Sequence, residues 1–264
     1  MSNPKISLLG PHEPDPFSFY NETGSAPVLV VCDHASRAVP QCLNQLGLTD
    51  DVFEKHVAWD IGTNLLGPEL ADALQAPAIL AGYSRLVVDL NRRLDDPTAF
   101  IEISDGIKIP GNVKLSKKQR QTRTEQLYHT YHGAIDTRLK RFLSENVIPV
   151  VISVHSFTPS LNAFERPWEI GVLWDRDPRI ARPLINALDK QGYCVGDNQP
   201  YSGKDPHDYT IDHHAEAQGL PYVSLEIRQD LITDPRGASK WAAVLSGALK
   251  PILADSDLYK YRSD

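Results

Sequence analysis

The sequence contains little cysteine and no long apolar run. The three cysteines, Cys32, Cys42 and Cys194, are an odd number without the spacing of a metal site or redox motif. We therefore expect reduced thiols, which are typical of a cytoplasmic protein, and no disulfide framework. No uninterrupted apolar run reaches about eighteen residues, and no apolar segment follows a basic N-terminus, so neither a membrane span nor a secretory signal is predicted.

The chain also lacks an excess of basic charge and three common catalytic signatures. The net charge of -7 at pH 7 disfavours a nucleic acid partner, because such binding depends on Lys and Arg neutralising phosphates. The patterns GxSxG, GxxxxGK[ST] and GxGxxG are absent. A serine hydrolase, a nucleotide hydrolase and a dinucleotide-dependent oxidoreductase therefore lack their local chemistry here.

The composition is that of a globular domain of ordinary polarity. Hydrophobic residues make up 41% of the 264 residues and charged residues 23%. This length suffices for one large α/β domain, and no internal repeat divides it. We therefore predict a single domain over residues 1–264, in which residues 1–27, rich in proline, asparagine and glycine, form an irregular N-terminal arm.

Apolar runs and helical patterns alternate along the chain. The runs predict strands at 28–31, 77–80, 84–90, 150–154, 170–174 and 222–227. The 3.6-residue patterns predict helices at 40–48, from about 52 to 74, at 116–145 with Ser116 as N-cap, at 178–191 before Gly192, and at 236–253. This alternation indicates an α/β fold of three αβα layers with a mixed, largely parallel sheet.

Three of the predicted strands run into ionisable side chains. His34 follows the run 28–31, His155 follows 150–154, and Glu226 comes at the end of 222–225. The carboxyl ends of parallel strands meet at one edge of a sheet, where ligands bind in open α/β folds. Each histidine alone is more often a core residue that bonds to the backbone, but the pair favours metal ligation, as in a metal hydrolase.

A third metal ligand and a base complete this interpretation. Asp33 and Asp60 compete for the ligand position, and we prefer Asp60. Neighbouring strand residues such as Asp33 and His34 point to opposite faces, whereas Asp60 would come from a helix above the site. Glu226 is the candidate general base, although it could instead be an end-of-strand residue paired with Arg228.

A group of polar residues is suited to holding a substrate carboxylate. Guanidinium groups bind carboxylates in bidentate fashion, although a single Arg at a strand end is more commonly a solvated charge. The candidate substrate-binding residues are Arg85, Asn91, Arg92, Ser36, His132 and His214.

Several motifs, in this order, resemble those of the N-formylglutamate amidohydrolases, also called N-formylglutamate deformylases. They are CDHAS followed by Pro40, WDIGT around Asp60, YSRLVVDLNR, YHTYHGAI around His132, SVHSF around His155 and SLEIRQDLI around Glu226. The resemblance covers about residues 28–231. It implies a fold related to the zinc carboxypeptidases, that is, a zinc-exopeptidase-like or phosphorylase/hydrolase-like fold.

The resemblance also implies roles for individual residues. His34, His155 and Asp60 look like the ligands of one zinc ion, and Glu226 looks like the glutamate that activates zinc-bound water. Arg85, Asn91 and Arg92 resemble the residues that hold the substrate carboxylate. The HxxE motif of the carboxypeptidases is absent, because Arg37 stands where its glutamate would be. The choice between Asp60 and Asp33 therefore stays open.

The sequence as a whole predicts a cytoplasmic, zinc-dependent hydrolase that cleaves the amide bond of an N-acyl amino acid such as N-formylglutamate. Its expected partner is a small carboxylate-bearing N-acyl amino acid, without nucleic acid or membrane, and assembly into a homo-oligomer is left open. Two alternatives are a metal-dependent peptidase acting on short acidic or cell-wall peptides and a non-catalytic anion-binding homologue.

Overall fold

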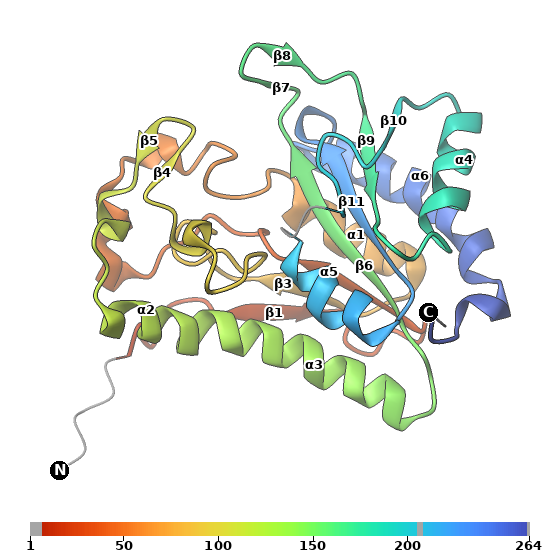
Figure 1. Cartoon of the computed structure of the whole chain (residues 1–264), viewed down its shortest axis with the longest axis horizontal. Helices are drawn as coiled ribbons and strands as arrows, with labels where there is room; N and C mark the ends of the chain where they lie inside the picture. The colour runs from red at the N-terminus through yellow and green to blue at the C-terminus, as the bar shows by residue number, and fades with distance from the viewer. Residues whose placement is uncertain (1–6, 205–207, 263–264) are drawn as a thin grey trace.

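The computed structural model describes residues 7–204 and 208–262, so residues 1–6 of the expected arm lie outside the described part. Within these ranges a seven-stranded sheet forms the centre of the molecule (Figure 1). The strands, in their order across the sheet, are β1 (Phe17–Tyr20), β3 (Ala78–Ala81), β2 (Val28–Cys32), β6 (Val150–Phe157), β11 (Tyr222–Arg228), β9 (Ile170–Leu173) and β10 (Val195–Asp197).

The middle of this sheet is parallel and its flanks are mixed. Strands β3, β2, β6 and β11 run in one direction, whereas β1 pairs antiparallel with β3 and β9 pairs antiparallel with β11. The edge strand β10 is parallel to β9. The predicted mixed, largely parallel sheet is therefore confirmed.

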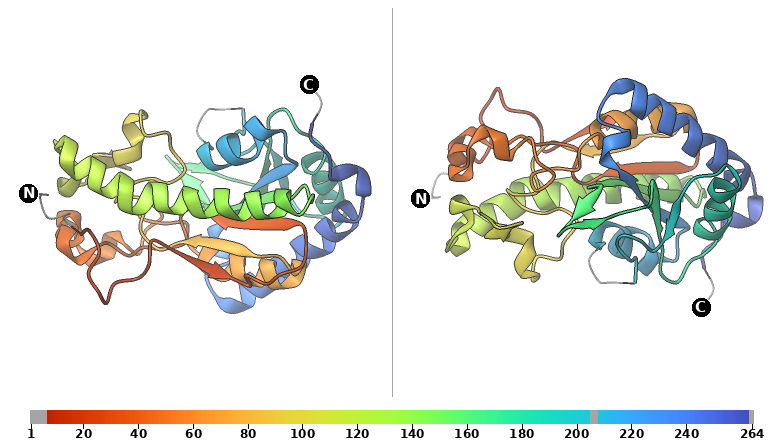
Figure 2. Two further views of the ribbon diagram at one scale, coloured as in Figure 1. Left: turned by 90° about the horizontal axis from the view of Figure 1, so that it is seen from below. Right: turned by 90° about the horizontal axis from the view of Figure 1, so that it is seen from above.

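Helices cover both faces of the sheet. Alternate residues of β2 point to opposite faces, so Val28 and Val30 enter one hydrophobic core and Leu29 and Val31 the other. The first core is closed by α1 (Thr63–Leu74), α4 (Ala181–Lys190) and α6 (Pro235–Leu253), the second by α3 (His129–Ser144) and α5 (Tyr209–His214). Figure 2 shows α1 and α6 together on one side of the sheet and α5 on the other. The three-layer αβα architecture is confirmed.

The predicted long helix over 116–145 forms with its expected cap. The Ser116 hydroxyl accepts a hydrogen bond from the Gln119 N–H, and the Gln119 side chain returns one from the Ser116 N–H, a reciprocal capping box. The helix is continuous through α2 (Lys117–Arg123), a π-helical turn (Thr124–Tyr128) and α3. None of the helices in the described ranges combines the length and the apolar character needed to cross a membrane.

The strand predicted at 84–90 is wrong. This segment forms buried turns and pairs with no strand, and β3, which precedes it, has β1 and β2 on its two sides. Side chains from elsewhere replace a strand partner: Asn112 Nδ2 donates to the Leu86 carbonyl at 2.9 Å and Arg123 Nη1 donates to the Val87 carbonyl at 3.0 Å. A buried apolar run whose carbonyls are satisfied in this way needs no sheet.

The helix predicted from about residue 52 is also wrong in its first part. A single 3₁₀ turn at Asp50–Val52 precedes a loop, and α1 begins only at Thr63. Gly62 has a φ of +89°, and a Cβ there would clash with the Ile232 carbonyl oxygen, so glycine allows the sharp turn before the helix. The segment predicted as a helix over 40–48 is a 3₁₀ stretch at Gln41–Gly47, interrupted by left-handed residues.

The arm is less irregular than predicted, because Phe17–Tyr20 forms the edge strand β1. Two short hairpins project from the sheet layers (Figure 1). They are β4 (Ile103–Ser104) with β5 (Ile107–Lys108), and β7 (Ser160–Leu161) with β8 (Phe164–Glu165).

Candidate functional site

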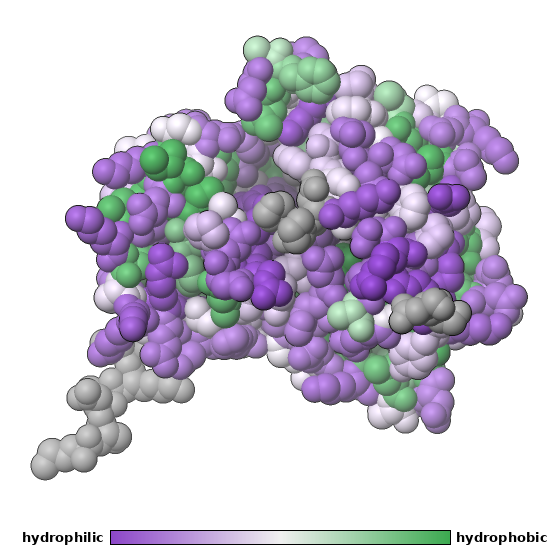
Figure 3. All heavy atoms as spheres, viewed as in Figure 1, coloured by the Kyte–Doolittle hydropathy of each residue, from purple (hydrophilic) through white to green (hydrophobic). Residues whose placement is uncertain are grey.

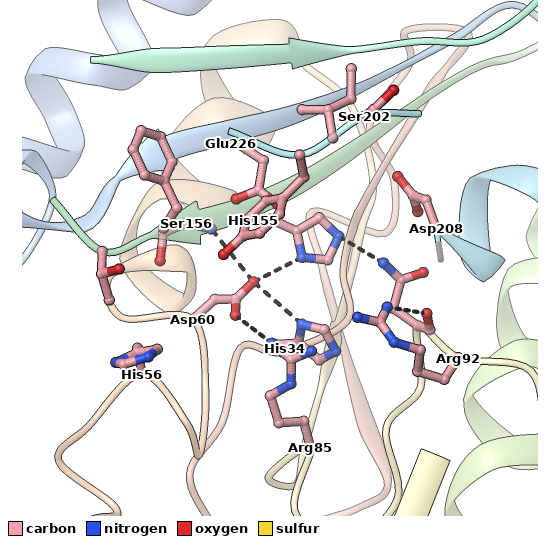
Figure 4. Close-up of a pocket in the computed structure, with 15 residues that line it drawn as sticks. His34, His56, Asp60, Arg85, Arg92, His155, Ser156, Ser202, Asp208 and Glu226 are labelled. Carbon is pink, nitrogen blue, oxygen red and sulfur yellow. Dashed lines mark hydrogen bonds and ion pairs between the residues drawn. The ribbon is translucent and has the colours of Figure 1, made fainter. Parts of the chain in front are cut away.

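Two histidines and an aspartate converge at the carboxyl ends of β2 and β6 (Figure 4). His34 stands in the turn after β2, whereas His155 lies inside β6, which continues three residues past its predicted end. Asp60 comes from the loop before α1, and not from a helix as predicted; its N–H donates to the His34 carbonyl at 3.0 Å. The Asp60 Oδ2 atom is 2.8 Å from His155 Nδ1 and 3.3 Å from His34 Nδ1. We call these three residues the cavity cluster.

The outer nitrogens of both imidazoles are also held by polar groups. His34 Nε2 is 2.8 Å from Asp89 Oδ1. His155 Nε2 is 3.0 Å from Ser153 Oγ and 3.4 Å from Asp33 Oδ2. Asp33 thus lies behind His155, on the far side from Asp60. Of the two candidate aspartates, only Asp60 faces the point where the Nδ1 atoms meet.

The cavity cluster fits a divalent metal ion. One ligand atom from each residue can be chosen so that all three lie within 4.8 Å of one another, and all three residues are buried. Two imidazoles with one carboxylate are a common ligand set for catalytic zinc. Carboxylates behind the imidazoles, as Asp89 and Asp33 are here, fix the orientation of metal-binding histidines in many proteins. The donor chemistry and its supporting shell are therefore both present.

The charges of the cluster stabilise one another. Burial would lower the pKa of His155, but its contacts with Asp33 and Asp60 outweigh burial and raise it well above its usual value. Burial would likewise raise the pKa of Asp60, and His34 and His155 hold it below its usual value. Without a metal, these contacts therefore favour the protonated imidazoles and the ionised carboxylates.

Glu226 stands beside the cavity cluster. It lies within β11, paired in register with His155 on β6, so both side chains leave the same face of the sheet. Its Oε2 atom is buried and has no hydrogen-bond partner among the described residues. Burial, together with the nearby negative charges of Asp60 and Asp208, raises the pKa of Glu226 to about 8. The suggested ion pair with Arg228 does not form, because Arg228 Nε donates to Asp230 Oδ1 at 2.8 Å.

These groups face a cavity of about 220 Å³. On the side of the molecule shown in Figure 3, the surface is hollowed between the β4–β5 and β7–β8 hairpins. Sequence reasoning missed several of its walls, including Tyr201, Ser202 and Asp208, because they come from a polar connecting segment without periodicity. The described residues that line it are His34, His56, Asp60, Arg85, Asn91, Arg92, His155, Ser156, Phe157, Thr158, Leu173, Tyr201, Ser202, Asp208 and Glu226.

The predicted residues Arg85, Asn91 and Arg92 all line this cavity, but the two arginines make different contacts. Arg85 donates twice to Asp89 Oδ2, at 2.9 and 2.7 Å, and lies 3.4 Å from Asp60 Oδ1, so its guanidinium is already engaged by carboxylates. Arg85 also lines the cavity, and its predicted contact with the substrate carboxylate stays a prediction. Arg92 lines the cavity, where its Nη1 donates to the Asn91 carbonyl at 2.9 Å.

Three predicted substrate-binding residues lie outside the lining of the cavity. The Ser36 hydroxyl accepts a hydrogen bond from the Ala38 N–H at 3.1 Å and faces separate surface hollows. His132 and His214 are buried against each other behind the cavity wall, with 2.9 Å between His132 Nδ1 and His214 Nε2. The predicted role of these three residues in substrate binding therefore stays a prediction, and none of them belongs to the cavity lining.

Comparison with known proteins agrees with the fold and motifs. The N-formylglutamate amidohydrolase family matches residues 26–233. Similar solved structures include a gene product of Agrobacterium tumefaciens, 32% identical over 94% of this chain and 98% of that one, with a TM-score of 0.91. The N-formylglutamate amidohydrolase of Ralstonia eutropha JMP134 shares the fold, at 18% identity over 90% and 97% of the two chains and a TM-score of 0.59. No curated protein matches. Because the family match spans most of its length, the chain belongs to the N-formylglutamate amidohydrolase family.

Proposed function

We propose that this protein is a metal-dependent amidohydrolase that cleaves the acyl amide of a carboxylate-bearing N-acyl amino acid, with N-formylglutamate as the first candidate substrate. The observation that carries the proposal is the buried convergence of the cavity cluster beside the partnerless carboxylate oxygen of Glu226. Family membership supports the same class of reaction.

The cavity cluster would hold one divalent ion through His34, Asp60 and His155. Because catalytic zinc commonly binds two imidazoles and a carboxylate, zinc is the ion we propose. When bound, it would polarise the acyl carbonyl and make a water molecule more acidic. Asp89 and Asp33 would keep the outer nitrogens of the imidazoles occupied, so that the Nδ1 lone pairs point inward.

Glu226 is the proposed general base. It would take a proton from the attacking water as the C–O bond forms, and give that proton to the amine nitrogen as the C–N bond breaks. The products are the carboxylic acid of the acyl group and the free amino acid. The raised pKa of Glu226 means that it holds its own proton in the metal-free protein, whereas it would ionise beside a bound cation.

Arg92 is the proposed anchor for the substrate carboxylate. Both Arg92 and Arg85 line the cavity, and Arg85, which contacts Asp89 and Asp60, would also position those carboxylates. The volume of about 220 Å³ lies below the range of roughly 300–1,000 Å³ that is usual for drug-sized ligands. The size therefore favours a single acylated amino acid over a longer peptide.

The metal dependence is tested by removing the metal with a chelator, reloading zinc and assaying a panel of N-formyl and other N-acyl amino acids. We expect turnover to disappear on chelation and to return when zinc is added back. Glu226→Gln should retain metal and substrate affinity while kcat falls roughly 10²- to 10⁴-fold. Chelation-resistant turnover, or wild-type turnover by Glu226→Gln, would contradict the proposal. Substrate binding without any turnover would indicate the anion-binding homologue, and cleavage only of short acidic peptides would indicate the peptidase.

The anchor is tested with two neighbouring arginines. A hydrogen bond to a charged group contributes about 1.5–3 kcal/mol, so Arg92→Ala should raise KM roughly 10- to 100-fold with a smaller change in kcat. Arg93→Ala is the matched control, because Arg93 is exposed and pairs with Asp95 at 3.0 Å. Equal KM values for the two variants would remove Arg92 from the substrate site.

A further inference from the structure

A second group of two histidines and an aspartate lies between α3 and α5, outside the cavity lining. It consists of Asp136, His213 and His214, each of which offers one ligand atom within 4.8 Å of the others. We call it the helix cluster. His214 Nδ1 is 3.0 Å from Asp136 Oδ1. The helices that carry these residues lie beside one another in Figures 1 and 2. The proposed catalytic reaction does not use the helix cluster.

A chain of hydrogen bonds fixes the direction in which His214 presents its lone pair. His132 Nε2 is 2.9 Å from the Leu90 carbonyl oxygen, which can only accept, so His132 carries its hydrogen on Nε2. A neutral His132 then accepts at Nδ1, and His214 Nε2, 2.9 Å away, must donate. A neutral His214 therefore has a bare lone pair at Nδ1, directed at the carboxylate of Asp136.

This arrangement requires a positive charge between two acceptors. An imidazole lone pair and a carboxylate oxygen 3.0 Å apart repel each other unless a proton or a metal ion lies between them. The side chain of His214 is fully buried, and His213 brings a third donor atom within 4.8 Å of the other two, so three ligand atoms surround this space, as a metal ion requires.

We propose that the helix cluster binds a divalent transition-metal ion of the zinc class through His214 Nδ1, Asp136 and His213. Imidazole and carboxylate ligands suit zinc, whereas calcium and magnesium prefer oxygen ligands alone. His132 takes the supporting position behind His214, as outer hydrogen-bond partners do at other metal sites. His213 and the half-exposed Asp136 open to solvent, so water would complete the coordination.

Neighbouring residues hold the side chains of the helix cluster and connect α5 to the cavity wall. The ring of His213 stacks on Tyr209, one helical turn earlier in α5, at 5.0 Å between centroids and 13° between planes. His132 and Asp136 are four residues apart on α3 and so share one helix face. The backbone N–H of Thr210 in α5 donates to Asn91 Oδ1 in the cavity wall at 2.9 Å, so an ion at the helix cluster would also tie this wall to α3.

The proposal is tested by calorimetric titration of the metal-free protein with Zn²⁺, alongside His213→Ala and Asp136→Asn. Both changed side chains reach solvent, so these variants should fold. We expect each to bind one equivalent fewer than wild type, or that equivalent at least about tenfold more weakly. His129→Ala, an exposed histidine on α3 outside both clusters, is the control and should bind as wild type does. The increase in Tm on adding Zn²⁺ should shrink in the two test variants but not in the control.

Equal stoichiometry and affinity in all four proteins would overturn the proposal and assign the space beside His214 Nδ1 to a proton. Saturation of the helix cluster by Mg²⁺ would overturn the choice of metal class. The outcome is independent of the proposed function, because each variant is compared with wild type. If the cavity cluster binds no metal, His155→Ala should instead bind the same number of zinc equivalents as wild type, with the same affinity.

Discussion

The protein presents the same three donors, two imidazoles and a carboxylate, in two different settings. The cavity cluster is buried where β2 and β6 end, and it has an open volume and Glu226 beside it. The helix cluster joins two helices at the surface, and it has neither a cavity lining nor a partnerless carboxylate oxygen among its described residues. If both proposals hold, the donor set alone would suffice for ion binding, whereas hydrolysis would also require a base and space for a substrate.

The two settings also differ in electrostatics. Behind the imidazoles of the cavity cluster stand Asp89 and Asp33, and these carboxylates help to raise the pKa values of His34 and His155 despite burial. Behind His214 stands another imidazole, His132, and burial lowers the pKa of both to about 3. The carboxylates behind the first pair would strengthen its binding of a cation, whereas the second pair would depend on one half-exposed carboxylate.

The largest expected effect comes from separating the clusters by mutation. His155→Ala removes a proposed ligand of the catalytic ion, and we expect turnover to fall at least roughly 10³-fold, since metal polarisation supplies several kcal/mol of transition-state stabilisation. The zinc equivalent at the helix cluster should remain, which also shows that the variant is folded. Turnover measurements and a zinc titration of the same sample test both statements. Retained activity would mean that His155 is not a ligand.

The next effect is a pH dependence of stability. In the metal-free protein the pKa of Glu226 is about 8, against 4.5 in an ordinary glutamate, so the folded state keeps a proton that the unfolded state releases between these values. This stabilisation is complete below pH 4.5 and is lost as the pH rises towards 8. At 1.36 kcal/mol per pKa unit it is on the order of a few kcal/mol.

Urea unfolding at pH 5 and pH 8 in the presence of a chelator measures this effect. Relative to wild type, Glu226→Gln should gain stability at pH 8 compared with pH 5, because glutamine has no proton to lose. A constant difference between the two proteins at both pH values would show that Glu226 ionises normally. The helix cluster contains no buried carboxyl group with this behaviour, so its variants should not alter the slope.

A smaller effect is expected from the carboxylate behind His155. Asp33→Asn preserves size but removes the charge 3.4 Å from His155 Nε2, and we expect zinc affinity at the cavity cluster to weaken roughly 10- to 100-fold. Tyr131→Phe is a graded control, since it removes only the hydroxyl that donates to Asp33 Oδ1 at 2.7 Å. If Asp33→Asn binds zinc as wild type does, the supporting shell does not set affinity.

The smallest effect concerns a residue that the sequence assigned to the substrate. Ser36→Ala should leave kcat/KM within about twofold, because its hydroxyl accepts from Ala38 N–H and lies outside the cavity lining. The lost hydrogen bond should reduce the free energy of unfolding by about 1 kcal/mol. Steady-state kinetics decide the point: a tenfold loss of kcat/KM would return Ser36 to the site.

Much of the site could be predicted, because short-range patterns encode it. Buried β-branched runs next to His34, His155 and Glu226 predict parallel strands with ionisable side chains at their ends. The structure brings these three side chains close together. The choice of Asp60 over Asp33 rested on an expected helix around Asp60, and the structure has a loop there. The observed cause is a hydrogen bond between the Asp60 N–H and the His34 carbonyl, and no local pattern signals it.

The sequence by itself determined the parallel strands, the capped helix over 116–145 and the donor types at the strand ends, because apolar periodicity and capping are local properties. The tertiary structure alone decided that 84–90 is no strand and that Arg85 is paired. It also brought Asp136 to His213 and His214. The physical reason is that buried polar groups take partners from distant segments, as Asn112 and Arg123 do for the carbonyls of Leu86 and Val87. Such pairing depends on which segments the packed core brings together.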